Sequence, residues 1–571
     1  MILDIAHGLS PLLIIVVGAL VLMTIEALSK PRGNEGPSAS LASATTVVLL
    51  ASGTAAAGLW LRGPENLLGL KQFEPYLLTD RFNLAFYVIL TLGGALTTLL
   101  AGGYLPEHKL DRGEFYPLVM LSTLGCMALA AAGDLLTIFI ALETMSLGVY
   151  SMVAFRHGSP RSIEAALKYF HSFAAGLFLY GAALLYGATG HTDLVSIGEQ
   201  LAKTHTRMPL GTTGAQDVLL TAYHNSAPLV VVGLVLVLVG LAFKVNAVPF
   251  HMWTPDAYEG APTPGTTFMA VAVKAAAFAM MMRVLLVAFG DVRSASWGAG
   301  WPPAVAAMAL ATMTIANFIA GRQESVKRML AYSSIAHAGY LLVGVVAATR
   351  MPKEANAAVV SYLLTYTVST VAAFGALILC GSRGAEAVSY EDLAGLGRRH
   401  PPAALAMSFF LLSLAGLPPL AGFFGKFYLF WVSIDSGFIW LAVLGLINSV
   451  IAAYYYLRVL VFMYMKEPET GAPIATPMKS GHVSTALVLA AVLVLLLGLL
   501  PGSTLEAALL NGIEKNPRAS ALAGRMQPMK RCSTNRGARR AKVASRVQIS
   551  AGRLCNGCKG RPADVQVLYK P

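Results

Sequence analysis

Ionisable side chains interrupt several of the long apolar runs in this sequence. Glu143 lies within Leu135–Tyr150 and has no basic residue within ten positions, and Lys274 lies near the centre of Met269–Met280. Placing a charge at the middle of a bilayer costs at least about 2.5–3.5 kcal/mol on insertion scales, so residues that bear this cost usually mark ion or proton pathways. Both residues are therefore candidates for proton chemistry.

Lys244 is the natural partner of Glu143. An ammonium beside a carboxylate gives up its proton more readily when the carboxylate moves away or is neutralised. The pair is therefore predicted to act as a switch for a proton. The alternative is a static ion pair that only holds two helices together.

Two histidines could extend such a relay, because histidine titrates near neutral pH. His337 lies in the middle of the apolar segment 332–340, and His251 follows Pro249. For both residues the alternative is a hydrogen-bonded histidine in the core, and the sequence does not separate the two interpretations.

Two further lysines are candidates of the same kind. Lys426 follows a second proline-containing segment, and Lys168 lies near the start of a predicted helix. Lys426 could instead snorkel to the membrane interface. Lys168 could reach inward toward Glu143 or could anchor the helix at the cytoplasmic surface.

Two of these lysines lie at proline-containing breaks in apolar helices. The first break runs from Gly240 to Pro255 and contains Lys244, and the second runs from Leu414 to Lys426. A proline removes a backbone donor and clashes with the preceding turn, and the freed polar groups survive in a membrane only when buried in protein or facing a wet cavity. Broken helices at matching positions indicate a transport pathway, whereas a packing kink is the simpler alternative.

The broken helices belong to a long series of apolar segments. At about 20 apolar residues per crossing, the sequence contains about 14 candidate spanning helices, centred near residues 19, 51, 92, 123, 146, 176, 241, 275, 311, 338, 368, 417, 450 and 491. The breaks fall in the seventh and twelfth helices, and an odd offset of five reverses the membrane orientation. We therefore expect an all-α polytopic membrane protein with two inverted five-helix repeats, each containing a broken helix.

This interpretation divides the chain into five sections. They are the N-terminal helices 1–3 in residues 1–113, the first antiporter-like repeat (helices 4–8) in 114–290, the second (helices 9–13) in 291–466, helix 14 in 467–513, and a basic tail in 514–571. The polar stretch from about Gly190 to Ala227 is predicted to be an external loop with a short surface helix.

The composition excludes a soluble protein. Of the 571 residues, 56% are hydrophobic and 12% are charged, against about 25% charged in a typical soluble domain. The net charge of +13 would suggest a nucleic-acid partner, but residues 514–571 hold 14 of the 42 Lys and Arg and only 2 of the 29 Asp and Glu. The rest of the chain, with 28 and 27, is almost neutral. We therefore expect a lipid bilayer and no nucleic acid.

The charges of the loops predict the orientation in the membrane. Loops after odd-numbered helices hold 15 Lys and Arg, and loops after even-numbered helices hold 8. Because positive charge is enriched in cytoplasmic loops, the odd loops should be cytoplasmic and both termini should lie outside. Ser10–Leu28 is long enough to span and lacks a basic n-region, so it is predicted to be a spanning helix and not a cleavable signal.

The sequence lacks the usual motifs for redox cofactors and nucleotides. It contains no G-x-G-x-x-G after a strand, no P-loop and no cysteine cluster for an iron–sulfur centre. Cys555 and Cys558 form a lone CxxC without a second ligand pair, which is more simply a chance spacing than a zinc or redox site. We expect no redox cofactor and no metal in this chain.

Several motifs resemble subunit N of bacterial NADH-quinone oxidoreductase (respiratory complex I), a family of antiporter-like membrane subunits. The resemblance covers roughly residues 5–505, and it rests on Phe243-Lys244, Pro249–Pro264, Lys274–Ala276, Arg328–Tyr340, Tyr390–Leu396 and Leu414–Tyr428. The run Trp-Thr-Pro-Asp-Ala-Tyr-Glu-Gly-Ala-Pro at 253–262 is the most specific part, because the sister antiporter-like subunits continue differently there. A lysine at the second break also fits subunit N.

The resemblance implies one proton-pumping module of a membrane arm, driven by quinone reduction in other subunits. By position, Glu143 and Lys244 resemble the family's coupling pair, Lys274 resembles the central relay lysine, Lys426 resembles the exit-side lysine, and Lys168 resembles a further lysine of this subunit. NADH, FMN, iron–sulfur clusters and the quinone site would belong to partner subunits. The implied partners are sister antiporter-like subunits and small membrane subunits, and the implied location is the bacterial inner membrane.

Two other functions stay open at this point. One is a subunit of an Mrp-type cation/proton antiporter or of a membrane-bound hydrogenase complex, which share the broken-helix modules, although the 253–262 run argues against it. The other is a non-pumping scaffold of the membrane arm. Buried ionisable residues argue against a scaffold, which has no reason to bear their insertion cost.

The basic tail, residues 514–571, has no apolar period and no part that resembles the family. It would follow an even number of helices and lie outside, where few positive charges are expected. We interpret the tail as disordered, or as a shifted reading frame past the native end. Mass spectrometry that detects peptides covering residues 540–559 in the native complex would contradict the reading-frame interpretation.

Overall fold

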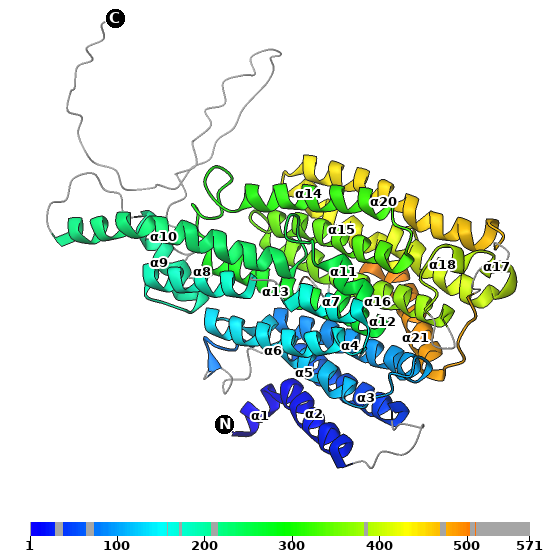
Figure 1. Cartoon of the computed structure of the whole chain (residues 1–571). Helices are drawn as coiled ribbons and strands as arrows, with labels where there is room; N and C mark the ends of the chain where they lie inside the picture. Colours follow the sequence, from blue (N-terminus) through cyan, green and yellow to red (C-terminus); the bar gives the residue numbers. More distant parts are fainter. Residues whose placement is uncertain are drawn as a thin grey trace, which may run out of the picture. The chain divides into compact units, whose positions relative to one another are not determined.

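The computed structural model of the chain is built from helices (Figure 1). It describes residues 2–509, except 29–37, 64–72, 157, 171–173, 207–214, 382–385, 469–474 and 503–508. These residues all belong to one compact unit, Met1–Leu522. The described ranges contain no β-strand, only isolated bridges such as Leu77 with Ala132. The all-α membrane fold is therefore confirmed, and the predicted basic tail lies outside the described residues.

The helices fall into two runs along the chain. The first run is α1 Ile2–Gly8, α2 Ser10–Leu28, α3 Ser38–Arg62, α4 Arg81–Glu107, α5 Phe115–Ala131, α6 Leu135–Val153, α7 Pro160–Phe170, α8 Ala174–Thr189, α9 Leu194–Thr206, α10 Ala215–Lys244, α11 Thr254–Gly260, α12 Thr263–Phe268, η3 Met269–Val273, α13 Lys274–Arg283 and η4 Val284–Ala288. The second run is α14 Pro302–Ala320, α15 Val326–Ala347, α16 Pro352–Cys380, η5 Glu391–Leu393, α17 Leu396–Arg399, α18 Pro401–Ala415, α19 Ala421–Asp435, α20 Ile439–Met465 and α21 Gly481–Leu499.

Eleven helical segments in the described part of the chain are long and apolar enough to cross a membrane. Three shorter apolar helices accompany them, namely Phe115–Ala131, Pro228–Lys244 and Pro401–Ala415. The predicted helix centres fall in these segments, except residue 417, which lies in the second break. The exact number of crossings, about 14, stays a prediction. The predicted loop from Gly190 to Ala227 is interrupted by α9, as expected, but α10 begins within it, so the connection is shorter than predicted.

Both predicted helix breaks are present. The first separates α10, which ends at Lys244, from α11, and the chain between them contains Asn246 with a positive φ of 64°. The second separates α18 from α19 and begins at Gly416, whose φ of 91° ends α18 in the left-handed region. Glycine adopts this conformation without the steric cost that a Cβ atom brings. Prolines in the breaks and this glycine explain why the helices stop there.

The helix after the first break is, together with α15, among the most enclosed elements of the described part of the chain. α12, η3, α13 and η4 follow one another from Thr263 to Ala288, and 94% of the most apolar window of this span is buried. η3 and η4 are π-helical turns, which occur frequently at functional sites. Lys274 is the first residue after η3.

α4, α5 and α16 enclose this segment, and other helices pack in pairs around it. α14 and α15 lie side by side, as do α3 with α4 and α8 with α10 (Figure 1). α16 packs against α4, α15, α18, α19 and α21. Ser325 caps the start of α15, because its Oγ accepts from the backbone N of Arg328 at 3.2 Å. This cap fixes the start of α15, and so fixes the positions from which the Lys327 and Arg328 side chains project.

Candidate functional site

Lys244 is buried at the first break, with 3% of its surface exposed. Its Nζ donates to Ser146 Oγ on α6 at 2.9 Å and lies 5.4 Å from the centroid of the Tyr169 ring. Glu143 is one turn before Ser146 on α6, and its charge interacts with that of Lys244. The structure thus brings the predicted pair together across a serine, and not in a direct ion pair.

Glu143 lies on an apolar face of α6 that the described part of the chain leaves largely exposed. It is half-buried, and Leu136, Ile140 and Leu147, at helical spacing around it, are 52%, 64% and 59% exposed. These three leucine and isoleucine side chains together with Glu143 are called the α6 stripe below. A carboxylate in such a stripe is costly to expose to lipid.

Lys274 is 1% exposed and points at α15. Its Nζ contacts both the backbone carbonyl oxygen and the Oγ of Ser334. Tyr366 OH donates to the same Ser334 Oγ at 2.9 Å, and the Lys274 ammonium lies 5.3 Å from the centroid of the Tyr366 ring. Its described partners are neutral hydroxyl, carbonyl and aromatic groups.

His337 is 4% exposed on α15, one turn beyond Ser334. Its Nδ1 lies 2.6 Å from Tyr362 OH, and its Nε2 lies 3.2 Å from Tyr456 OH. Both ring nitrogens therefore have hydroxyl partners. These partners fit a core histidine, and they also fit a relay, because a hydroxyl can donate and accept.

Lys426 is 6% exposed and turns back into the second break. Its Nζ donates to the carbonyl oxygens of Leu414 and Ala415 at 3.0 and 2.9 Å, and to Ser449 Oγ at 3.0 Å. Those carbonyls end α18, where the helix dipole attracts a cation. Protein groups surround this side chain, which favours a role inside the bundle over snorkelling to the interface.

Aromatic rings connect Lys274, His337 and Lys426 in one row, and Lys244 lies at the first break beside it. The Tyr366 ring lies near both Lys274 and His337, with centroids of the Tyr366 and His337 rings 5.0 Å apart. The Tyr340 ring lies 5.7 Å from His337 and 5.4 Å from the Lys426 ammonium. On the other side, Lys244 lies beside Tyr169 on α7, and α11, which follows the first break, packs against both α7 and α15.

The remaining two candidates lie apart from this row. Lys168 on α7 is half-exposed and forms ion pairs with Glu164 at 2.7 Å and Asp256 at 2.8 Å. This position matches a surface anchor better than a side chain that reaches Glu143. His251 lies in the first break and is half-buried, and its Nδ1 has no hydrogen-bond partner in the described part of the chain.

Sequence reasoning missed the neutral partners of the row. Ser146, Ser334 and the tyrosines lie in apolar helices, where such residues are common in any packed bundle. Their spacing in the sequence could have indicated them, because some lie one turn from a lysine or glutamate on the same helix face, as Ser146 does from Glu143. The described residues contain no cluster of three His, Cys, Asp or Glu side chains that could hold a metal ion.

The helical fold, two broken helices and a row of buried lysines define an antiporter-like membrane subunit. Residues 132–452 match the family described as NADH:quinone oxidoreductase/Mrp antiporter, TM. NADH-quinone oxidoreductase subunit N 1 of Sorangium cellulosum (strain So ce56) is 62% identical over 505 residues, which are 87% of this chain and 96% of that protein. The chain therefore belongs to the subunit N family of NADH-quinone oxidoreductase, a proton-translocating complex.

Solved structures agree with this assignment. A chain of respiratory complex I from Thermus thermophilus with bound aureothin is 35% identical, with a TM-score of 0.68 over 88% of this chain and 100% of that chain. A chain of the Mrp complex from Dietzia sp. DQ12-45-1b has a TM-score of 0.74 over 92% and 99% of the two chains. At 21% identity, the Mrp chain shows a shared fold alone. Other subunits of complex I are therefore partners of this multi-span membrane protein.

Proposed function

We propose that Glu143, Lys244, Lys274 and Lys426 form a stepwise proton relay. A change of charge at Glu143 drives the proton of Lys244 toward Lys274, and Lys426 releases a proton on the outer side. The row of buried cations with hydroxyl and aromatic neighbours supports this proposal. A buried ammonium without a carboxylate partner can lose its proton at low cost, because burial disfavours the charged form.

His337 is proposed to pass protons between Lys274 and Lys426, since it lies between them and both of its nitrogens face hydroxyls. Lys168 and His251 have weaker support, because neither contacts the row. We propose that Lys168 acts at the surface where protons are collected or helices are anchored, and that His251 acts within the first break.

The exposed α6 stripe supports a finer proposal about partners. We propose that a neighbouring membrane-arm subunit covers it and controls the charge of Glu143, and that the partners include sister antiporter-like subunits and small membrane subunits. NADH, FMN, iron–sulfur clusters and quinone then belong to partner subunits. The location is the bacterial inner membrane, with both termini outside.

Substitutions within the row test the relay. Glu143→Gln and Lys274→Ala, each in the reconstituted complex, should lower proton pumping and coupled quinone reduction about 100-fold or more, the scale at which removed proton-transfer groups act. Pumping is measured by the acidification of proteoliposomes after NADH addition.

Exposed ion pairs provide the matched controls. Glu467 and Lys466 are 82% and 49% exposed, so Glu467→Gln and Lys466→Ala change the same residue types without touching the row. All rates are divided by the amount of assembled complex. Pumping at the wild-type rate in the assembled Glu143→Gln and Lys274→Ala complexes would refute the relay.

The Mrp antiporter alternative predicts different partners. To separate this alternative from the present proposal, the native complex is purified and the subunits that co-purify with this chain are identified. Quinone-reductase subunits support the present proposal, whereas antiporter or hydrogenase subunits would overturn it.

A further inference from the structure

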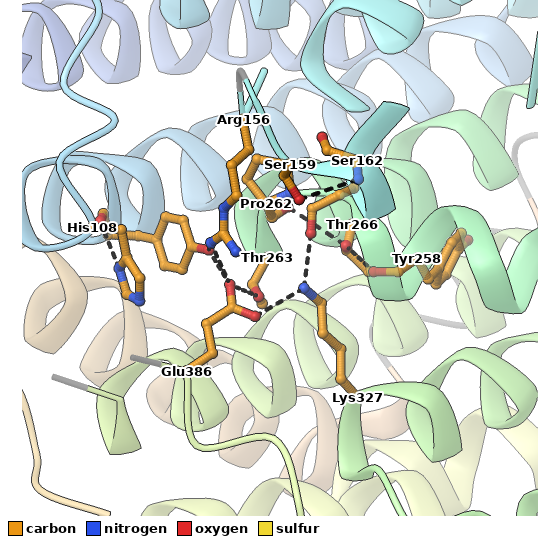
Figure 2. A network of polar contacts seen from close by, with 12 residues as sticks. His108, Arg156, Ser159, Ser162, Tyr258, Pro262, Thr263, Thr266, Lys327 and Glu386 are labelled. Carbon is orange, nitrogen blue, oxygen red and sulfur yellow. Dashed lines mark hydrogen bonds and ion pairs between the residues drawn. The ribbon is translucent and has the colours of Figure 1, made fainter. Parts of the chain in front are cut away.

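A second buried charge cluster surrounds Glu386, in the connection between α16 and η5. Figure 2 shows Arg156, Thr263 and Lys327 pointing at this carboxylate from three different parts of the chain. Thr263 Oγ1 donates to Oε1 at 3.1 Å, and Arg156 Nη2 lies 3.5 Å from the same oxygen. Tyr104 OH also donates to Oε1, and Lys327 Nζ donates to Oε2 at 3.2 Å.

Lys327 connects this cluster to the first broken helix. It is 1% exposed, and its Nζ donates to the carbonyl oxygen of Ala261 at 2.8 Å as well as to Glu386. Ala261 is the residue that directly follows α11, and α12 begins two residues later. One ammonium therefore joins the start of α15 to the junction of α11 and α12.

Arg328, the next residue in the chain, contacts the same part of the structure nearer the protein surface. Arg328 forms ion pairs with Asp256 at 2.8 Å and with Glu259 at 2.6 Å, both on α11. Consecutive residues on a helix point in different directions, so Lys327 reaches inward and Arg328 reaches toward the surface. Together they fix the start of α15 against α11 from two sides.

The two helices joined here carry two partners in the proposed relay. Ser334 lies on α15, two turns or about 10 Å beyond Lys327 at 1.5 Å per residue. Lys274 lies on the helix that continues from α12, and it contacts Ser334 directly. The contact between Lys274 and Ser334 and the contact between Lys327 and Ala261 therefore both join α15 to the continuous stretch from Ala261 to Lys274. A rotation or shift at one contact moves the other.

Glu386 itself is unsuited to carrying protons. Burial raises the pKa of its carboxyl group, but the Lys327 ammonium, the Tyr104 hydroxyl and the Arg156 guanidinium outweigh burial and lower the pKa from 4.5 to about 2. His108 stacks on the Tyr104 ring, with the two ring centroids 4.0 Å apart. The carboxylate therefore stays ionised at neutral pH, which suits a fixed counter-charge.

We propose that Glu386 is a positioning residue for the relay, which acts through Lys327 to hold α15 against the α11–α12 junction and so keeps Ser334 on Lys274. This inference rests on the proposed relay. Glu386 and Lys327 act as one unit, and neither exchanges a proton during turnover.

The decisive variant removes both charges. Loss of one partner of a buried ion pair leaves an uncompensated charge and destabilises the protein, whereas loss of both often preserves stability. The double variant Glu386→Gln/Lys327→Met should therefore assemble, but it loses the link to Ala261. Its proton-pumping rate per assembled complex should fall about tenfold, because a misplacement of about 1 Å can cost up to about 100-fold.

The matched control is the same double substitution in an exposed pair, Glu391→Gln/Lys466→Met. That pair is 3.3 Å long, and its side chains are 44% and 49% exposed. The control should pump at the wild-type rate. The KM for quinone should be unchanged in both double variants, so the effect of Glu386→Gln/Lys327→Met appears in kcat and in protons pumped per NADH oxidised.

Single variants test whether the two residues act as a unit. Glu386→Gln and Lys327→Met, measured per assembled complex, should each pump no faster than the double variant. Two results would overturn the positioning role. One is pumping at the wild-type rate by the double variant. The other is a fold-reduction in pumping by the double variant that equals the product of the fold-reductions in the two single variants. Lys274→Ala is measured alongside. If Lys274→Ala pumps at the wild-type rate, the proposed relay is wrong. If Lys274→Ala is slow but the Glu386→Gln/Lys327→Met double variant pumps at the wild-type rate, the relay stands and only the positioning role of Glu386 is wrong.

Discussion

Single residues show what the sequence could and could not predict. The buried lysines and Glu143 were predictable because an ionisable residue inside an apolar run has few neutral explanations. Tyr340 and Tyr366, which link the cations, were not predictable, because a tyrosine in an apolar helix is ordinary in any packed bundle. Glu386 was missed for a different reason, since it lies in a connection whose sequence does not show burial.

The ionisation of Glu386 predicts how the stability of the complex depends on pH. Its pKa is lowered from 4.5 to about 2, so its contribution to stability is present above pH 4.5 and is lost only as the pH falls toward 2. At about 1.4 kcal/mol per pKa unit, that contribution is about 3 kcal/mol. The thermal-unfolding midpoint of the assembled complex should therefore be lower in Glu386→Gln by the same amount at every pH from 9 to 5, as measured by intrinsic fluorescence. A difference that shrinks between pH 7 and pH 5 would show that the carboxylate titrates there, contrary to this account.

At the scale of elements, the sequence predicted the two breaks because proline and glycine act locally. It did not predict which helix each lysine side chain would contact. Lys426 turns back to the end of α18, its own preceding helix, whereas Lys274 contacts α15 from another part of the chain. Such contacts depend on how helices pack, which apolar periodicity does not encode. The π-helical turns next to Lys274 also have no sequence signal that we could identify.

The packing of α5 on α6 gives a prediction at this scale. Gly125 on α5 lies against α6, and a Cβ there would be 2.4 Å from the backbone nitrogen of Met145, beside Ser146. Gly125→Ala must therefore push the helices apart, at a cost of about 1–3 kcal/mol for overpacking, and should weaken the contact between Lys244 and Ser146. We expect a lower unfolding midpoint and slower pumping per assembled complex.

Gly58→Ala on α3 is the control, because a Cβ at that position meets nothing within 4 Å. It should leave both the midpoint and the pumping rate unchanged. Equal behaviour of the two alanine variants would show that the close approach of α5 and α6 does not matter for the relay.

At the scale of the whole molecule, composition and loop charge predicted a membrane protein and an orientation. The membrane fold is confirmed, whereas the division into five sections and the placement of the termini remain predictions. The described residues end at 509, so the predicted character of the tail is tested by peptide mass spectrometry and not by this structure.

The orientation predicts which loops react from each side of the membrane. Ala299 follows the eighth predicted helix, and Glu467 follows the thirteenth, and both are exposed. In a background without the native cysteines, Ala299→Cys should react with a membrane-impermeant maleimide on intact spheroplasts, and Glu467→Cys should react only in inverted vesicles. The reverse pattern would place the termini in the cytoplasm.

The partners of the buried lysines also set which ions can enter the row. A dehydrated sodium ion needs several oxygen ligands to replace its water shell. The row instead presents ammonium groups, and their described contacts are serine hydroxyls, carbonyls and aromatic rings. A metal cation would meet positive charge wherever a lysine of the row holds its proton, whereas a proton would travel as the charge of one of these nitrogens. Selectivity for protons over sodium would then come from the chemistry of the carriers and would require no narrow filter.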